Sequence, residues 1–115
     1  MKKMKWTSET PWTQEEGINL ARAIEALAPQ AGAHIGLTGG LLYKDGPRKD
    51  LDIVVYRIRQ APEIHREKFF RLLRIACGIK VTQDYGFVVK ATQDDRVIDF
   101  LFPDYVDGTY EGGPA

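Results

Sequence analysis

Two aspartates separated by one residue stand at the start of an apolar segment, where carboxylates are uncommon. Residues 50–55 read Asp-Leu-Asp-Ile-Val-Val, a composition typical of a β-strand. Side chains two positions apart on a strand share a face, so Asp50 and Asp52 point to the same side. Neighbouring carboxylates repel each other, and a divalent cation such as Mg²⁺, which prefers oxygen ligands, would remove the repulsion. The pair therefore indicates a metal site, although an aspartate such as Asp50 at a strand start is also common turn chemistry.

A third aspartate, Asp99, is surrounded by apolar residues in the segment Val-Ile-Asp-Phe-Leu-Phe at positions 97–102. A buried carboxylate without a partner costs several kcal/mol, so this side chain needs a positive charge, a set of backbone amides or a metal ion. Three carboxylates from two strands could hold two ions, the arrangement used for phosphoryl and nucleotidyl transfer. The chief alternative is a salt bridge from Arg57, Arg71 or Arg96.

A glycine pair, Gly39-Gly40, lies between a predicted strand and a polar loop. Glycine there allows a positive φ and leaves backbone N–H groups free to meet the oxygens of a phosphate. Most glycine pairs are turns and nothing more, so this pair indicates a phosphate site only together with the aspartates. The loop also carries Lys44, Arg48 and Lys49, which could neutralise phosphates or belong to a solvated surface.

These residues must be positioned by helices and strands that the sequence pattern also predicts. Thr13, followed by Glu16, forms a capping-box pattern that starts a helix, and Pro29 ends it. Pro62 is expected at the start of a second helix that ends at Gly78. After the first helix, the predicted elements are a strand over 34–38, a strand over 51–58, a helix over 63–77, a short strand over 80–82, and strands over 87–91 and 96–102 joined in a hairpin by residues 92–95.

This order predicts an α+β domain with a mixed β-sheet of about four or five strands and two helices packed on it. The 115 residues suit one domain with one core. Residues 13–103 are expected to form the domain, with an irregular arm over 1–12 and a flexible tail over 104–115. Four aromatic residues of these end segments are expected to cover the edges of the domain, with base stacking as the alternative: Trp6, Trp12, Tyr105 and Tyr110.

Composition narrows the classes of function. Sixteen basic and sixteen acidic side chains give a formal net charge of zero, which argues against a domain held on nucleic acid by bulk charge and leaves nucleic acid as an acceptor only. No apolar run approaches the roughly 20 residues that span a bilayer, and no apolar stretch follows the basic N-terminus, so a cytoplasmic protein is expected. The single cysteine, Cys77, allows no intramolecular disulfide, and His34 and His65 are interpreted as structural or solvated.

The glycine pair and the aspartates together resemble a known signature. Leu-Thr-Gly-Gly at 37–40, a spacer of nine residues and Asp-Leu-Asp at 50–52 are similar to the signature of the DNA polymerase β-like nucleotidyltransferase superfamily. Ile-Asp-Phe at 98–100 looks like the third carboxylate of that family. The resemblance covers about residues 33–102, is strongest with the minimal nucleotidyltransferases, and implies a nucleotidyltransferase-like fold.

The resemblance also implies the chemistry of the site. Asp50 and Asp52 would hold two Mg²⁺ or Mn²⁺ ions, and Asp99 would complete the shell of the second ion and help to deprotonate a hydroxyl. The backbone of Gly39 and Gly40 would contact the triphosphate. The hydroxyl would attack the α-phosphorus of a nucleoside triphosphate such as ATP, and pyrophosphate would leave.

The sequence departs from the family in two respects that bear on activity. Gly40 stands where serine is more usual, and the helical region with which most members grip the base or the acceptor does not follow Asp99. A helical partner protein or a second copy is therefore expected to supply that surface. Two other interpretations stay open: an inactive nucleotidyltransferase fold used as a binding or antitoxin-like module, and a structural α/β domain whose acids are salt-bridged.

Overall fold

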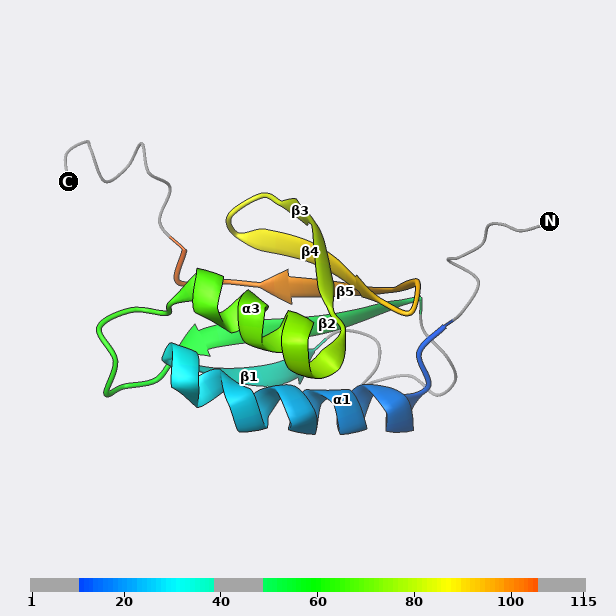
Figure 1. Cartoon of the computed structure of the whole chain (residues 1–115), viewed down its shortest axis with the longest axis horizontal. Helices are drawn as coiled ribbons and strands as arrows, with labels where there is room; N and C mark the ends of the chain where they lie inside the picture. Colours follow the sequence, from blue (N-terminus) through cyan, green and yellow to red (C-terminus); the bar gives the residue numbers. More distant parts are fainter. Residues whose placement is uncertain (1–10, 39–48, 106–115) are drawn as a thin grey trace.

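The structure, a computed structural model, describes residues 11–38 and 49–105. Two α-helices, a short 3-10 helix and five strands follow one another in these residues (Figure 1). Their bounds are α1 (Gln14–Leu27), η3 (Ala28–Ala31), β1 (Ala33–Thr38), β2 (Asp50–Arg57), α3 (Arg66–Cys77), β3 (Lys80–Asp84), β4 (Val88–Gln93) and β5 (Arg96–Leu101). The predicted α+β class, with a mixed sheet and two helices packed on it, is confirmed.

The five strands form one sheet in the order β1-β2-β5-β4-β3. β2 and β5 are parallel neighbours near the centre, and the other three pairs are antiparallel. The chain passes through α3, β3 and β4 between β2 and β5, so two strands that are far apart in sequence lie side by side (Figure 1). This central pairing positions the predicted site.

Alternation along the strands gives the sheet one buried face and one open face. The buried face includes Leu51, Ile53 and Val55 of β2 with Ile98 and Phe100 of β5, all fully buried. Both α1 and α3 lie on this side of the sheet (Figure 1). Because successive side chains of a strand point to opposite faces, the residues between these point to the other face, which none of the described helices covers. We call that side the open face.

The first helix begins as the sequence predicts. The Thr13 hydroxyl oxygen accepts a hydrogen bond from the Glu16 amide, and the Glu16 carboxylate accepts one from the Thr13 amide, both at 3.1 Å. The second of these bonds lowers the pKa of the Glu16 carboxyl, an effect that the nearby Arg96 strengthens. The capping box is confirmed. Among the described residues, no helix combines the length and apolar character needed to cross a membrane.

Trp12, directly before this helix, belongs to the core. Its side chain is 1% exposed, and its Nε1–H donates to the carbonyl of Val97 at 2.8 Å. The Arg96 guanidinium lies 3.9 Å from the centroid of the indole ring. The expectation that tryptophan in this segment packs against the domain is confirmed for Trp12, which fastens the start of α1 to the start of β5.

The edge strand β1 has one of its outward amides covered by a side chain of α1. The Glu25 carboxylate accepts a hydrogen bond from the Ile35 amide at 2.8 Å, and its other oxygen lies 2.6 Å from Nδ1 of His34. An unpaired edge amide would otherwise be open to another chain. His34 therefore has a structural role, one of the two roles, structural or solvated, that the sequence indicated.

The second helix begins three residues later than predicted, at Arg66. Pro62 lies in the loop before it instead of opening it, so this prediction is wrong. The His65 amide donates to the carbonyl of Ala31 at 2.8 Å, a contact that ties the loop to η3. This tertiary hydrogen bond holds the loop out of the helix. Once begun, α3 packs its Phe69 edge-to-face on the ring of Phe100, with 5.8 Å between centroids.

A glycine at the end of η3 is required by its conformation. Gly32 has φ +80°, and a Cβ there would lie 2.8 Å from the carbonyl oxygen of Glu63 and 3.1 Å from Cβ of Ala61. We expect Gly32→Ala to lower the free energy of unfolding by at least about 1–2 kcal/mol, the cost of a left-handed backbone for a residue with a Cβ. Urea denaturation measures this change.

Gly36 of β1 is the matched control. A Cβ there would meet no described atom within 4 Å. Gly36→Ala is therefore expected to change the free energy of unfolding by less than about 0.5 kcal/mol. Equal losses at Gly32 and Gly36 would contradict the conformational explanation.

Candidate active site

The parallel pairing of β2 and β5 brings two of the predicted site residues together. Asp52 pairs directly with Asp99 in the register of these strands. Both side chains point to the open face, because their neighbours Leu51 and Ile98 are buried on the helix face. Two carboxylates that are far apart in the chain therefore occupy adjacent positions on one surface.

Asp50 lies two positions before Asp52 on the same face of β2, where it pairs with Val97 and is exposed. All three aspartates thus occupy neighbouring positions on the open face. In the part of the chain that the structure describes, no three side chains of Asp, Glu, His or Cys come close enough together to hold a metal ion. The aspartate side chains would have to change rotamer to bring their oxygens around one ion.

Asp99 has a positively charged partner, Lys90 of β4. The register of β4 and β5 places the two residues opposite each other, and the Lys90 Nζ donates to Asp99 Oδ1 at 2.9 Å. The Asp99 side chain is 15% exposed and the Lys90 side chain 40%. This hydrogen bond raises the pKa of the Lys90 ammonium against an opposing effect of burial, and the charges of Asp99 and Asp50 raise it further. Lys90 is therefore charged at neutral pH.

The arginine partners that the sequence suggested for Asp99 are wrong. The Arg57 guanidinium donates to two carbonyls of the loop after β2. Arg96 pairs with Glu16 at 3.0 Å, and Arg71 lies on α3, across the sheet. The partner is a lysine on the neighbouring strand.

The sequence contains a feature that predicts the position of Lys90 opposite Asp99, and this feature is the turn between β4 and β5. The predicted four-residue loop over 92–95 gives a register two residues away from the observed one. The structure has a two-residue turn, Asp94-Asp95, with positive φ at both positions (52° and 66°). Such turns match the twist of hairpin strands, and aspartate tolerates the left-handed region. This shorter turn sets Lys90 opposite Asp99.

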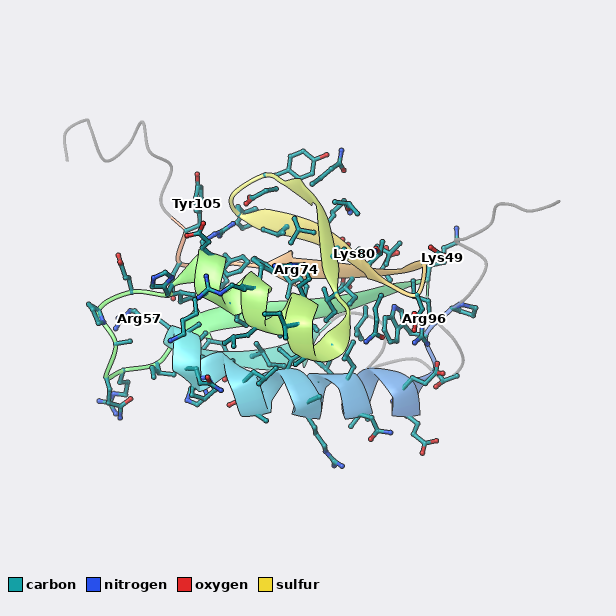
Figure 2. The ribbon with its side chains drawn as sticks, viewed as in Figure 1. Lys49, Arg57, Arg74, Lys80, Arg96 and Tyr105 are labelled. Atoms are coloured by element: carbon teal, nitrogen blue, oxygen red, sulfur yellow. The ribbon has the colours of Figure 1, made fainter. Side chains whose placement is uncertain are left out.

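The predicted triphosphate side is described only in part. Four of its residues lie outside the described chain: Gly39, Gly40, Lys44 and Arg48. Thr38, the residue directly before the glycine pair, is the last of β1 and pairs with Asp52. Lys49 is exposed beside the start of β2, at the end of the sheet opposite Arg57 (Figure 2). The described ends of this segment therefore lie beside Asp50 and Asp52.

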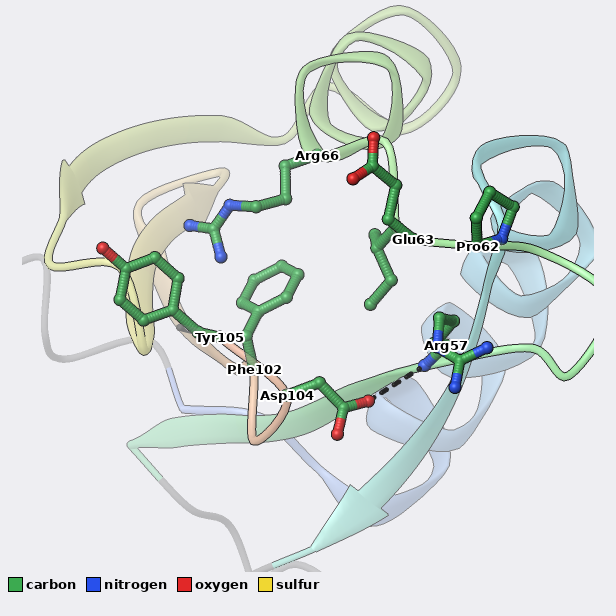
Figure 3. A pocket seen from close by; sticks show the side chains of 8 residues that line it. Arg57, Pro62, Glu63, Arg66, Phe102, Asp104 and Tyr105 are labelled. Carbon is green, nitrogen blue, oxygen red and sulfur yellow. Dashed lines mark hydrogen bonds between the residues drawn. The ribbon is translucent and has the colours of Figure 1, made fainter. Parts of the chain in front are cut away.

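A cavity of about 370 Å³ lies at the other end of the sheet (Figure 3). The Arg57 amide donates to Asp104 Oδ2 there at 3.5 Å, and the Arg66 guanidinium stacks 4.0 Å from the centroid of Phe102. None of the predicted site residues that the structure describes lines this cavity. Arg57 ends the strand that Asp50 begins, so roughly 20 Å of strand separates the two places. The cavity is distinct from the aspartate cluster.

Comparison with known proteins bears on the fold. No protein-family model and no curated protein matches the sequence. A solved structure of a cytoplasmic RNA terminal U-transferase is similar, with a TM-score of 0.54 and 19% identity over 85% of this chain and 32% of that chain. The structure of Cid1, which has RNA terminal uridylyl transferase activity, is similar with a TM-score of 0.53 and 18% identity, over 85% of this chain and 34% of that chain.

This chain spans about a third of the length of each of these solved chains. At such low identity the similarity concerns the arrangement of helices and strands. That arrangement, a mixed sheet with both helices on one face, is the nucleotidyltransferase fold, the one that the resemblance to the DNA polymerase β-like superfamily predicts.

Proposed function

We propose that this chain is a metal-dependent nucleotidyltransferase domain that binds a nucleoside triphosphate and transfers its nucleotidyl group to a hydroxyl acceptor. The observation that carries the proposal is the pairing of Asp52 with Asp99 across two parallel strands, with Asp50 on the same open face. The nucleotidyltransferase fold supports it.

The residues of the open face fit a divalent cation. All three aspartates offer carboxylate oxygens, the donors that Mg²⁺ prefers and Mn²⁺ accepts. Asp99 is mostly buried, and its carboxylate accepts a hydrogen bond from the Lys90 ammonium. Asp50 and Asp52 would hold the ion, and Asp99 would lie beside it as the third carboxylate of the site. When bound, a divalent ion there would offset the charge of the triphosphate and ease removal of a proton from the hydroxyl.

The remaining steps belong to residues of the chain itself. The backbone amides of Gly39 and Gly40, which follow Thr38, would bind phosphate oxygens beside Asp52. Lys49 is exposed next to Asp50 and would attract the triphosphate by charge, together with two further basic residues of the loop, Lys44 and Arg48. The Asp99 carboxylate would orient the acceptor hydroxyl and accept its proton.

The acceptor surface is proposed to come from another protein, either a helical partner or a second copy. The open face has no described helix over it, and Tyr56 at the end of β2 is 43% exposed. In the similar solved structures, this fold accounts for about a third of the chain. Measuring the mass of the protein in solution at increasing concentration separates the two sources.

An inactive binding module remains the second candidate, and one observation favours it. The Lys90–Asp99 ion pair engages a carboxylate that an active site would need. A module of this kind would still bind a triphosphate or a partner protein, but it would release no pyrophosphate.

Binding of metal and triphosphate tests the proposal first. Isothermal titration with Mn²⁺ and a non-hydrolysable nucleoside triphosphate is expected to show binding of the triphosphate that requires the ion. In the variant Asp50→Asn with Asp52→Asn, this metal-dependent binding is expected to weaken at least about tenfold, because the ion loses two charged oxygen ligands.

Asp95→Asn is the matched control. Asp95 is exposed in the β4–β5 turn, and asparagine tolerates its left-handed backbone. This variant is expected to bind as the wild type does. If the wild type takes up triphosphate equally well in the presence of a chelator, or if the double variant binds unchanged, the acids serve as structural salt-bridge partners and the proposal fails.

A further inference from the structure

We infer that Lys90 supplies the positive charge beside Asp99 that the family resemblance assigns to a second metal ion, so the domain binds one divalent ion together with its triphosphate. The inference rests on the proposed function. It concerns a side chain that the sequence resemblance does not mention and that the hairpin places in the carboxylate cluster.

The contact between Lys90 and Asp99 engages one oxygen of the carboxylate that a second ion would need as a ligand. The ammonium nitrogen lies 2.9 Å from Asp99 Oδ1, and the Asp99 side chain is only 15% exposed. A Mg²⁺ ion bound to the same carboxylate would lie at about 2.0–2.1 Å from its oxygen. Both cations on one largely buried carboxylate would be close neighbours and would repel each other.

The backbone holds Lys90 in place on both sides. β4 is an interior strand, paired with β5 through the Lys90–Asp99 register and with β3 on its other edge. The Thr82 hydroxyl of β3 also donates to the Lys90 carbonyl at 3.1 Å. The backbone of Lys90 is therefore fixed opposite Asp99 by the strand pairing, and this pairing holds the two charged groups close together.

The charge of Lys90 acts on more than one carboxylate. Asp50, as well as Asp99, attracts the ammonium. Lys90 therefore supplies positive charge to this cluster alongside one divalent ion. Asp50 and Asp52, both on β2, are the ligands for that ion, while Lys90 and Asp99 form the other half of the cluster.

Removal of the ammonium is therefore expected to create room for a second ion. In Lys90→Met the uncompensated Asp99 carboxylate becomes an additional ligand beside Asp52. The repulsion between a unit charge and a dication about 4 Å apart corresponds, even in the dielectric of water, to more than about tenfold in affinity. We expect the variant to bind two Mn²⁺ ions per chain, the second at least about tenfold more tightly than wild type.

The test counts Mn²⁺ ions by electron paramagnetic resonance on the full chain saturated with a non-hydrolysable triphosphate, with the triphosphate alone as the blank. The expected numbers are one ion for wild type and two for Lys90→Met. Lys90→Arg keeps the charge and is expected to bind one. Lys80→Met removes a lysine from the edge strand β3, which β4 separates from the strand of Asp99, and is expected to bind one. Lys90→Met with Asp99→Asn is expected to return to one.

Two results would overturn the inference while leaving the proposed function intact: two ions in the wild type, or one ion in both wild type and Lys90→Met. If no variant binds Mn²⁺ with triphosphate, the proposed function fails and the inference falls with it. Should Lys90→Met unfold, Lys90→Gln keeps a polar contact to Asp99 without the charge and takes its place in the series.

Discussion

Replacing Asp99 with asparagine is expected to slow metal-dependent release of pyrophosphate by about 10²–10⁴-fold, the contribution typical of a positioned general base. Binding of the triphosphate is expected to change little, because Asp50 and Asp52 remain on β2. Asparagine keeps the size of the side chain and its place opposite Asp52, so the change isolates the carboxylate charge. Pyrophosphate release from a labelled nucleoside triphosphate, with Mn²⁺ and a panel of hydroxyl acceptors, measures the rate.

The same experiment separates the active enzyme from the binding module. If the domain is an active enzyme, the wild type and the turn control Asp95→Asn release pyrophosphate, and Asp99→Asn releases it far more slowly. A wild type that binds triphosphate and Mn²⁺ but releases no pyrophosphate with RNA, DNA, protein or small hydroxyl acceptors is a binding module. If a helical partner protein is found, it must be added to these assays together with the acceptors, because the open face of the sheet has no described helix over it.

Trp12→Ala is expected to lower the free energy of unfolding by about 3–5 kcal/mol, the range for removing a large aromatic side chain from a core. The indole ring is 1% exposed, donates a hydrogen bond to Val97 and lies under the Arg96 guanidinium. Its loss leaves a cavity and removes the hydrogen bond to the Val97 carbonyl at the start of β5. Urea denaturation followed by circular dichroism measures the loss.

Tyr85→Ala is the control for this prediction, since Tyr85 is 61% exposed. Its replacement is expected to change the free energy of unfolding by less than about 0.5 kcal/mol. The loss of unfolding free energy in Trp12→Phe should lie between the losses in Trp12→Ala and Tyr85→Ala, because phenylalanine refills part of the cavity but has no N–H donor. A loss of less than about 1 kcal/mol in Trp12→Ala would mean that the segment before α1 is not part of the cooperative core.

The effect of Trp12 extends to the aspartates. Val97, whose carbonyl accepts the indole hydrogen bond, pairs with Asp50 in the β2–β5 register. Loss of this anchor is therefore expected to loosen the end of the sheet that carries the site. Binding of Mn²⁺ and triphosphate by Trp12→Phe, which keeps most of the packing, shows how much of that effect depends on the hydrogen bond.

Several elements could be predicted because their signals are local. The Thr13 capping box, the buried alternation of β2 and the shared face of Asp50 and Asp52 follow from residues within one or two turns or steps of each other. The resemblance of the glycine pair and the aspartates to a nucleotidyltransferase signature is likewise read along the chain. These features account for the correct fold class.

Other features depended on contacts that the local pattern does not contain. The start of α3 is delayed by the hydrogen bond from the His65 amide to Ala31, which belongs to a distant segment. β3 extends to Asp84 although every residue in it is exposed, because it pairs with β4. The hairpin turn is shorter than predicted, and the resulting register sets Lys90 opposite Asp99, a pairing that the predicted loop does not give.

The sequence by itself determined which acids share a strand face, because the two-residue period of a strand is set by its own backbone. Only the tertiary structure decided that Asp52 meets Asp99 and that Lys90 meets Asp99. Those pairings depend on which strands become neighbours and in what register they pair. The burial of the shared core and the hydrogen bonds between strands that are distant in the sequence determine the neighbours and the register. The shared face of Asp50 and Asp52 could be predicted from neighbouring residues, whereas the positively charged partner of Asp99 could not.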